Sequence, residues 1–257
     1  MGFIFSELVY KPLYNLLIFT YDIIPIHDFG IVIIIVTLLI KFLLIPLSKK
    51  QIESQKKMQE LQPKIKEIQE KYKKDKEKQS RALMEFYKTN KTNPFSGCLP
   101  TIFQLVFLIA IYRVLFNISQ GGLIVDGNSL YSFVKNPGQI NQFFLGIVDL
   151  SKSLDLSHLG IKNLPHIILV ILAALSQYFQ TKMMMANMPK TSNNKSNNQD
   201  FSQIMTQQML YMGPLLTLFI GIKFPAGLAL YWLISTIFAI IQQQSLIADK
   251  NLKKAEK

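Results

Sequence analysis

Long apolar runs alternate with polar segments along the chain, and the runs have the length of membrane-spanning helices. A bilayer's hydrocarbon core of about 30 Å is crossed by about 20 helical residues at about 1.5 Å each. Five runs approach this length, at 29–47, 97–116, 164–183, 209–224 and 227–247. The pattern therefore predicts an all-α, polytopic membrane protein with five transmembrane helices.

Composition supports a membrane protein, and the motifs that are absent argue against several kinds of binding and catalytic site. The 257 residues are 49% hydrophobic, with a mean hydropathy of +0.24 and a net charge of +12. These values fit a multi-span membrane protein better than a disordered chain or a soluble basic domain. A single cysteine, Cys98, forms no internal disulfide. The three histidines are scattered, and the GxxxxGK[ST], GxGxxG and GxSxG motifs are absent. We therefore expect no metal, no cofactor and no enzymatic activity.

Lys41 is the one charged residue inside the apolar run 29–47. A charge within a bilayer costs from a few to more than ten kcal/mol (roughly), so such residues usually face a bundle interior or a watery cavity. Lys41 lies about 18 Å along the helix from Phe29, in one leaflet rather than at the centre. Two interpretations stay open: a functional polar cavity, and a lysine that extends to the nearer headgroups.

Residues 1–25 predict an amphipathic helix that lies in the membrane interface. Glu7, Lys11 and Asn15 recur at i, i+4 and i+8, and leucines and phenylalanines face elsewhere. The alternative is a short first span, which Pro12 and the two charges argue against.

Residues 48–94 carry 14 Lys/Arg and 7 Asp/Glu and predict a helical hairpin. An apolar stripe with alternating spacing of three and four residues would close it, although Pro63 should bend or restart its first helix. The charges alternate in sign, and the aromatic residues are not interleaved with them as stacking platforms for bases. A solvated face near anionic headgroups is therefore favoured over nucleic-acid binding. The stripe consists of Met58, Leu61, Ile65, Ile68 and Tyr72.

Charge distribution predicts the orientation. With five spans, the 14 Lys/Arg of the hairpin and the four lysines of the tail 248–257 fall on one side of the membrane. The three lysines of segment 117–163 fall on the other side. The positive-inside rule makes the first side cytoplasmic, together with the loop 184–208. The N-terminus is then external and the C-terminus cytoplasmic. Because no transit peptide rich in arginine and serine is seen, we expect a bacterial plasma (inner) membrane rather than an organelle. Lys41, Gln104 and Gln180 reach the cytoplasmic leaflet from three spans, which indicates a cavity open to the cytoplasm.

Three ordered blocks resemble the YidC/Oxa/Alb family of membrane-protein insertases across essentially the whole chain. The blocks are TLLIKFLLIPLSKKQIESQKKMQELQPKIKEIQEKY, NPFSGCLPTIFQLVFLIAIYRVL and FPAGLALYWLIST. The resemblance implies a short bacterial form, without the large periplasmic domain and extra N-terminal span of longer members. It also implies a hydrophilic groove, open to the cytoplasm and to lipid, where Lys41 stands in the place of the family's usual arginine.

The resemblance extends to individual residues. Thr37, Gln104, Gln180, Tyr231 and Trp232 would line the groove with Lys41, although Tyr231 and Trp232 are equally typical of packing aromatics. The hairpin would be a docking platform. Its expected docking residues, which include the LQPK motif, are Leu61, Pro63, Lys64 and Ile65.

We therefore expect a membrane-protein insertase and chaperone that moves short hydrophilic segments through the groove without ATP. Its partners would be nascent membrane proteins and the lipid bilayer, and the Sec translocon, the ribosome and the signal recognition particle receptor are further candidates. The alternative from another class is a small-solute transporter or channel in which Lys41 is the counter-ion. A chaperone that folds membrane proteins without inserting them fits the same groove.

Overall fold

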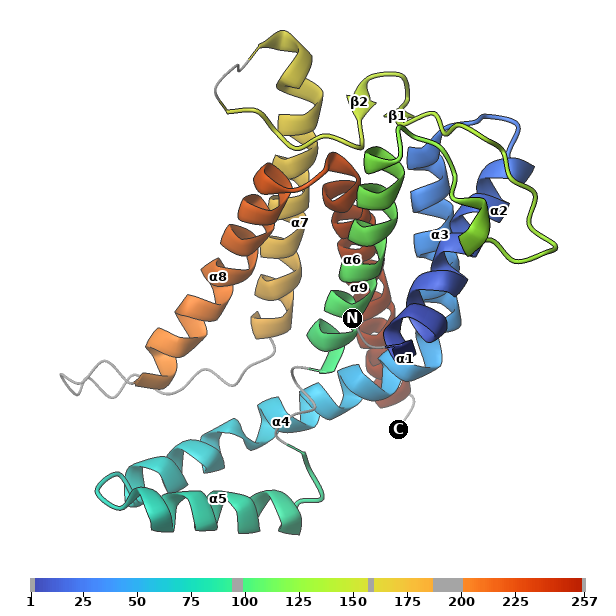
Figure 1. Ribbon diagram of the computed structural model, residues 1–257. Helices are drawn as coiled ribbons and strands as arrows, with labels where there is room; N and C mark the ends of the chain where they lie inside the picture. Colours follow the sequence, from blue (N-terminus) through green and yellow to red (C-terminus); the bar gives the residue numbers. More distant parts are fainter. Residues whose placement is uncertain (1–2, 94–98, 157–159, 187–200, 256–257) are drawn as a thin grey trace.

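The apolar runs form helices, and the computed structural model describes residues 3–93, 99–156, 160–186 and 201–255. A bundle is built from α3 (Phe29–Leu43), α6 (Leu99–Gln120), α7 (Leu164–Ala186), α8 (Phe201–Lys223) and α9 (Ala226–Ala255). Helix α9 contacts each of the other four. The hairpin of α4 (Ile45–Lys71) and α5 (Lys76–Thr89) projects from the bundle as an arm (Figure 1). The predicted all-helical fold is confirmed.

The apolar helices differ in length. In the described residues, Ile161–Met185 and Ala226–Leu246 are each long and apolar enough to cross a bilayer. Helices α3 and α4 reach that length only as a pair bent by 66°. Shorter apolar helices, Gln104–Gln120 and Leu210–Lys223, make up the rest. The bundle is thus compatible with a multi-pass membrane protein, and the count of five spans stays a prediction.

The helix that begins at Phe29 does not continue without a break to residue 47, the predicted end of the first span. Helix α3 ends at Leu43, and α4 (Ile45–Lys71) begins after a break at Leu44. Pro46 causes this break, because it has no N–H to donate to the carbonyl of Phe42 and its ring collides with that turn of the helix. Lys41 consequently lies in the last turn of α3, directly before the bend.

The predicted hairpin is present, with different limits. Helix α4 packs against α5 (Lys76–Thr89), and residues 72–75 join the two helices. Asp75 caps α5 by accepting a hydrogen bond from the backbone N–H of Lys78 at 3.0 Å. Pro63 lies inside α4, which runs through it, so the predicted restart of the helix is wrong.

The other limits follow tertiary structure rather than hydropathy. Helix α8 begins eight residues before the predicted run at 209, and α9 continues past 247, since polar residues extend both helices. Helix α6 runs to Gln120 rather than 116. Most of the predicted loop 184–208 and Cys98 lie outside the described residues.

The N-terminal segment is helical, as predicted, but one of its three predicted polar-face residues, Asn15, is buried. The segment consists of α1 (Phe3–Phe5), the π-helical turn η1 (Ser6–Tyr10) and α2 (Lys11–Ile23). Turn η1 packs on α6, and α2 packs on both α3 and α6. Glu7 and Lys11 form the expected ion pair at 2.9 Å. Asn15, however, is only 2% exposed. Its Nδ2 donates to Ser129 O at 3.0 Å, and its Oδ1 accepts from Tyr131 N at 2.6 Å.

Replacing Asn15 with alanine should destabilise the fold by about 1–3 kcal/mol, because the part-buried N–H of Tyr131 and carbonyl of Ser129 lose their partner. Unfolding in detergent micelles, followed by circular dichroism, measures this. Asn128→Ala is the control, since Asn128 is exposed. Equal stability of the two variants would contradict the prediction.

The segment between α6 and α7 forms a cap over one end of the bundle. It contains the 3₁₀ turns η3 (Gly127–Ser129) and η4 (Ile161–Asn163) and a two-stranded sheet. Strand β1 (Phe143–Phe144) pairs antiparallel with β2 (Val148–Asp149). Figure 1 shows this hairpin at the end of the bundle where α3 begins, and β1 contacts α3.

Candidate functional site: a polar cluster inside the helix bundle

Three helices bring polar side chains together where the apolar bundle would otherwise be continuous. Lys41 Nζ on α3 donates to Gln104 Oε1 on α6 at 3.2 Å. Ser235 Oγ on α9 donates to the same oxygen at 2.8 Å. We call Lys41, Gln104 and Ser235 the polar cluster. Its centre is an amide oxygen that accepts one charged and one neutral hydrogen bond, and Ser235 is 1% exposed.

Lys41 lacks a carboxylate partner among the described residues, whose ion pairs all lie elsewhere. A lysine that extends to headgroups would leave the bundle, but Lys41 Nζ instead contacts α6. The apolar neighbours Phe42 and Leu43 are 60% and 71% exposed. Lys41 thus turns inward while the residues that follow it turn outward, and its positive charge is left without a negative partner in the described chain.

Two buried polar atoms on α3 and α9 have no hydrogen-bond partner among the described residues: Thr37 Oγ1 and Gln242 Nε2. Thr37 lies one turn from Lys41 on α3 and is 2% exposed. Gln242 follows Ser235 by seven residues, so both lie on one face of α9. Buried polar atoms are normally paired, and unpaired ones call for an explanation such as a ligand.

The predicted aromatic pair lies on α9 in the core, and one member makes a hydrogen bond. Trp232 Nε1 donates to Gln177 Oε1 on α7 at 2.9 Å. Tyr231 and Trp232 are 3% and 8% exposed and both belong to the hydrophobic core. Gln180, the α7 residue expected in the groove, is half-buried and makes no side-chain hydrogen bond within the described chain. Its role stays a prediction.

Sequence reasoning missed Ser235 and the pairing of Gln177 with Trp232. Ser235 is a small polar residue within an apolar helix, a type enriched where helices pack in membranes. That signal was available but weak, since threonine and serine also occur in ordinary helix contacts. The pairing of Gln177 depends on how α7 and α9 are aligned, which no local pattern reveals.

A hydrogen bond links the arm to α7 of the bundle. Gln59 Nε2 of α4 donates to the carbonyl of Met184 near the end of α7 at 2.9 Å. Among the predicted docking residues, Pro63 and Lys64 are exposed, Leu61 is half-buried and Ile65 is only 4% exposed. Ile65 is therefore a packing residue in this arrangement.

Gln59→Ala should release the arm and raise the rate of trypsin cleavage at Arg81 by about fivefold. A net hydrogen-bond contribution of about 1 kcal/mol corresponds to that factor. Limited proteolysis of the protein in vesicles measures it, with Gln62→Ala on the same helix as the control. Cleavage at the native rate would show that this hydrogen bond does not hold the arm.

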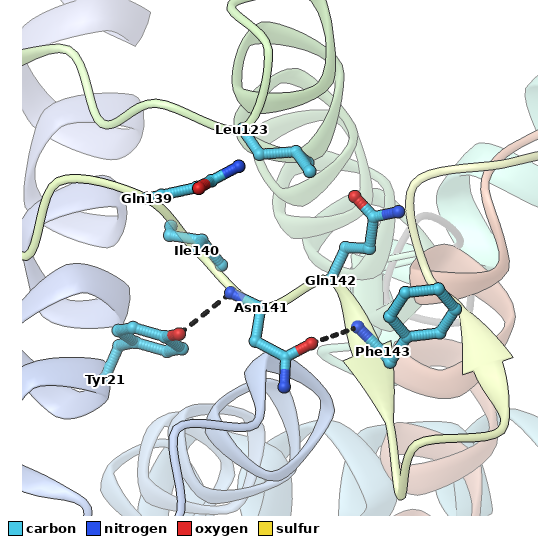
Figure 2. A pocket seen from close by; sticks show the side chains of 7 residues that line it. All are labelled: Tyr21, Leu123, Gln139, Ile140, Asn141, Gln142 and Phe143. Carbon is cyan, nitrogen blue, oxygen red and sulfur yellow. Dashed lines mark hydrogen bonds between the residues drawn. The ribbon is translucent and has the colours of Figure 1, made fainter.

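A separate hollow of about 380 Å³ lies in the cap, at the other end of the bundle from the arm. Figure 2 shows Asn141 at its centre: its backbone N–H donates to the Tyr21 hydroxyl at 2.8 Å, and its Oδ1 accepts from Phe143 N at 3.1 Å. Residues 139–143 and Leu123 line the rest. No three histidine, cysteine or acidic residues of the described chain are grouped as metal ligands.

Comparison with known proteins decides the family. The model of the family described as "60Kd inner membrane protein" matches residues 19–254. The chain belongs to this family, that of the YidC/Oxa insertases. Its apolar helices and the family together support a multi-pass protein of the inner membrane.

Proteins named "Membrane protein insertase YidC" are among the relatives. The one from Fusobacterium nucleatum is 33% identical over 217 residues, which cover 84% of each chain. The one from Geotalea uraniireducens is 34% identical over 239 residues, 93% of this chain and 37% of the relative. The one from Streptomyces avermitilis is 33% identical over 86% of this chain and 51% of the relative. The chain thus spans 37% and 51% of the two longer relatives.

Proposed function

We propose that the protein inserts nascent membrane proteins into the bilayer and helps them fold, by way of a hydrophilic groove around the polar cluster. The observation that carries this proposal is the hydrogen-bonded set of Lys41, Gln104 and Ser235 inside an apolar bundle. The name of the relatives, membrane protein insertase, supports the same activity.

The chemistry of the cluster suits this task. A hydrophilic segment that enters hydrocarbon loses water from its polar groups without replacement, and each unsatisfied group costs several kcal/mol (roughly). Unpartnered polar atoms such as Thr37 Oγ1 and Gln242 Nε2 would offer the segment hydrogen bonds on the way. Lys41, without a carboxylate of its own, would attract acidic residues of the segment.

The route has a direction in this proposal. Segments enter from the cytoplasm, beside the basic arm, and the N-terminus is external and the C-terminus cytoplasmic. The apolar helix of the substrate leaves sideways into lipid, driven by burial of apolar surface at about 25 cal/mol per Å². No ATP is needed, because this last step is downhill. Exposed Pro63 and Lys64 on the arm would receive the ribosome, the signal recognition particle receptor or the Sec translocon.

Reconstitution tests the activity. The purified protein in lipid vesicles receives a single-span substrate with a short acidic tail, and protection of that tail from protease reports insertion. We expect protection well above that of empty vesicles and without ATP. Protection equal to empty vesicles would overturn the proposal, and an ion flux through the same vesicles would favour the transporter alternative.

A further inference from the structure

The turn that joins β1 and β2 has a conformation that does not suit its residues. Ile147 N donates to Phe144 O at 3.0 Å, and the two residues between them have positive φ, +52° at Leu145 and +70° at Gly146. Two central residues with positive φ are typical of type I′ turns, which strongly prefer asparagine, aspartate or glycine. Glycine at 146 fits, but leucine at 145 does not, so turn geometry does not explain Leu145.

Core packing does not explain Leu145 either. Its side chain is 63% exposed, and those of Ile147 and Phe143 are 60% and 41% exposed. Val148 and Leu150, which follow on the same hairpin, are buried at 8% and 0%. The hairpin therefore has an inner side that packs on the bundle and an outer side that displays large apolar groups.

Asp28 fixes the turn at the beginning of α3. Its Oδ1 accepts from the backbone N–H groups of Gly30 and Ile31 at 2.8 and 3.1 Å, and its Oδ2 accepts from Leu145 N at 2.6 Å. One carboxylate thus caps the helix and holds the turn. Because the apolar run of α3 starts at Phe29, the turn lies at the level where the chain enters hydrocarbon.

The stretch of chain that contains the turn carries no charged side chain. Residues 136–148 contain no charged side chain, whereas every residue from 73 to 78, at the turn of the arm, is charged. On α3, Ile35 and Leu39 are 40% and 45% exposed, as lipid-facing residues would be. Strand β1 contacts α3, and the β1–β2 hairpin lies at the end of the bundle where α3 begins (Figure 1).

We propose that the turn Phe144–Ile147 is a lipid anchor, which inserts Leu145 and Ile147 among the acyl chains of the leaflet at this end of the bundle. Burial in acyl chains explains why an apolar residue occupies a position that favours asparagine. Because Asp28 ties the turn to α3, the anchor also sets the depth at which α3, and with it Lys41, lies in the bilayer. The proposal concerns lipid contact and needs no substrate.

Site-directed fluorescence tests it. Cys98→Ser removes the single cysteine, and Leu145→Cys or Ile147→Cys then carries an environment-sensitive nitrobenzoxadiazole label on the full chain in phosphatidylcholine–phosphatidylglycerol vesicles. Leu39→Cys is the lipid-facing control, and Lys74→Cys, on the exposed turn of the arm, is the aqueous control. We expect a blue-shifted emission at positions 145 and 147, with quenching by lipids that carry a nitroxide at a shallow acyl position.

Each other outcome overturns the proposal. Emission and iodide quenching equal to those of Lys74→Cys would place the turn in water. Protection from iodide without quenching by nitroxide lipids would mean that protein, such as a second copy of the chain, covers the turn. Leu145→Asn provides a variant that favours the turn conformation, so a label at 147 should keep its folded environment but lose part of its lipid quenching.

Discussion

Insertion of a substrate with an acidic tail should fall about tenfold or more when Lys41 is replaced by glutamate. Two charges about 4 Å apart in a medium of effective dielectric about 20 interact by about 4 kcal/mol. A third of that value, lost from the rate-limiting step, is about a tenfold change in rate. The effect should be large because Lys41 has no carboxylate partner in the described chain that would already offset its charge.

The sign of the substrate's charge provides the sharper readout. With a basic tail in place of the acidic one, Lys41→Glu should insert as well as the native protein or better. For the acidic tail, Lys41→Arg keeps the positive charge and should retain most of the native insertion rate. The rate of Lys41→Gln should lie between those of the native protein and Lys41→Glu. Rates of protease protection in vesicles measure all four. Lys74→Glu, on the exposed turn of the arm, is the matched charge change outside the bundle and should leave the rates unchanged.

Folding of these variants can be checked independently. Trp232 is the single tryptophan of the chain and its indole N–H is bonded to Gln177, so its emission reports the packing of α7 on α9. A native emission spectrum together with a native rate for acidic tails in Lys41→Glu would show that the charge of Lys41 is not needed for insertion.

Helices were predictable from the sequence because apolar and charged residues are separated into long blocks, and the local period of each block survives in the fold. The break at Leu44 was also encoded locally, by Pro46, although the continuous apolar run hid it. The direction of Asn15 was not, since its partners Ser129 and Tyr131 lie 114 and 116 residues away in the chain. A polar residue at a helical spacing indicates a solvent-exposed face only when it makes no hydrogen bond to a group that is distant in the sequence.

The candidate site was predictable to a similar degree. Lys41 and Gln104 stood out because each is polar within an apolar run, and they do meet. Ser235, which completes their hydrogen bonds, did not stand out, because a serine in an apolar helix costs little and carries no charge. The turn at Leu145 could not be predicted either, because it lacks the asparagine-glycine pattern by which such turns are recognised.

Gly30→Ala should destabilise the protein by about 1–3 kcal/mol, the usual cost of forcing extra volume into a packed site. A Cβ added to Gly30 would lie 2.6 Å from Phe144 Cβ and equally close to its Cγ. The first of these atoms is bonded directly to the backbone, so the strand itself must move. Such movement would also lengthen the bond from Leu145 N to Asp28, which caps the same helix.

Unfolding of Gly30→Ala in detergent micelles, compared with a matched glycine and with a double variant, separates the clash from other effects. Gly160→Ala is the matched control, since nothing lies within 4 Å of its added Cβ and its φ is negative. Phe144→Ala loses packing by itself, but combined with Gly30→Ala it should cost less than the sum of the two, because the clash is then removed. Strict additivity would mean that Gly30 matters for α3 alone. A deficit from additivity would establish that the cap and α3 are packed as one unit, as the shared carboxylate of Asp28 requires.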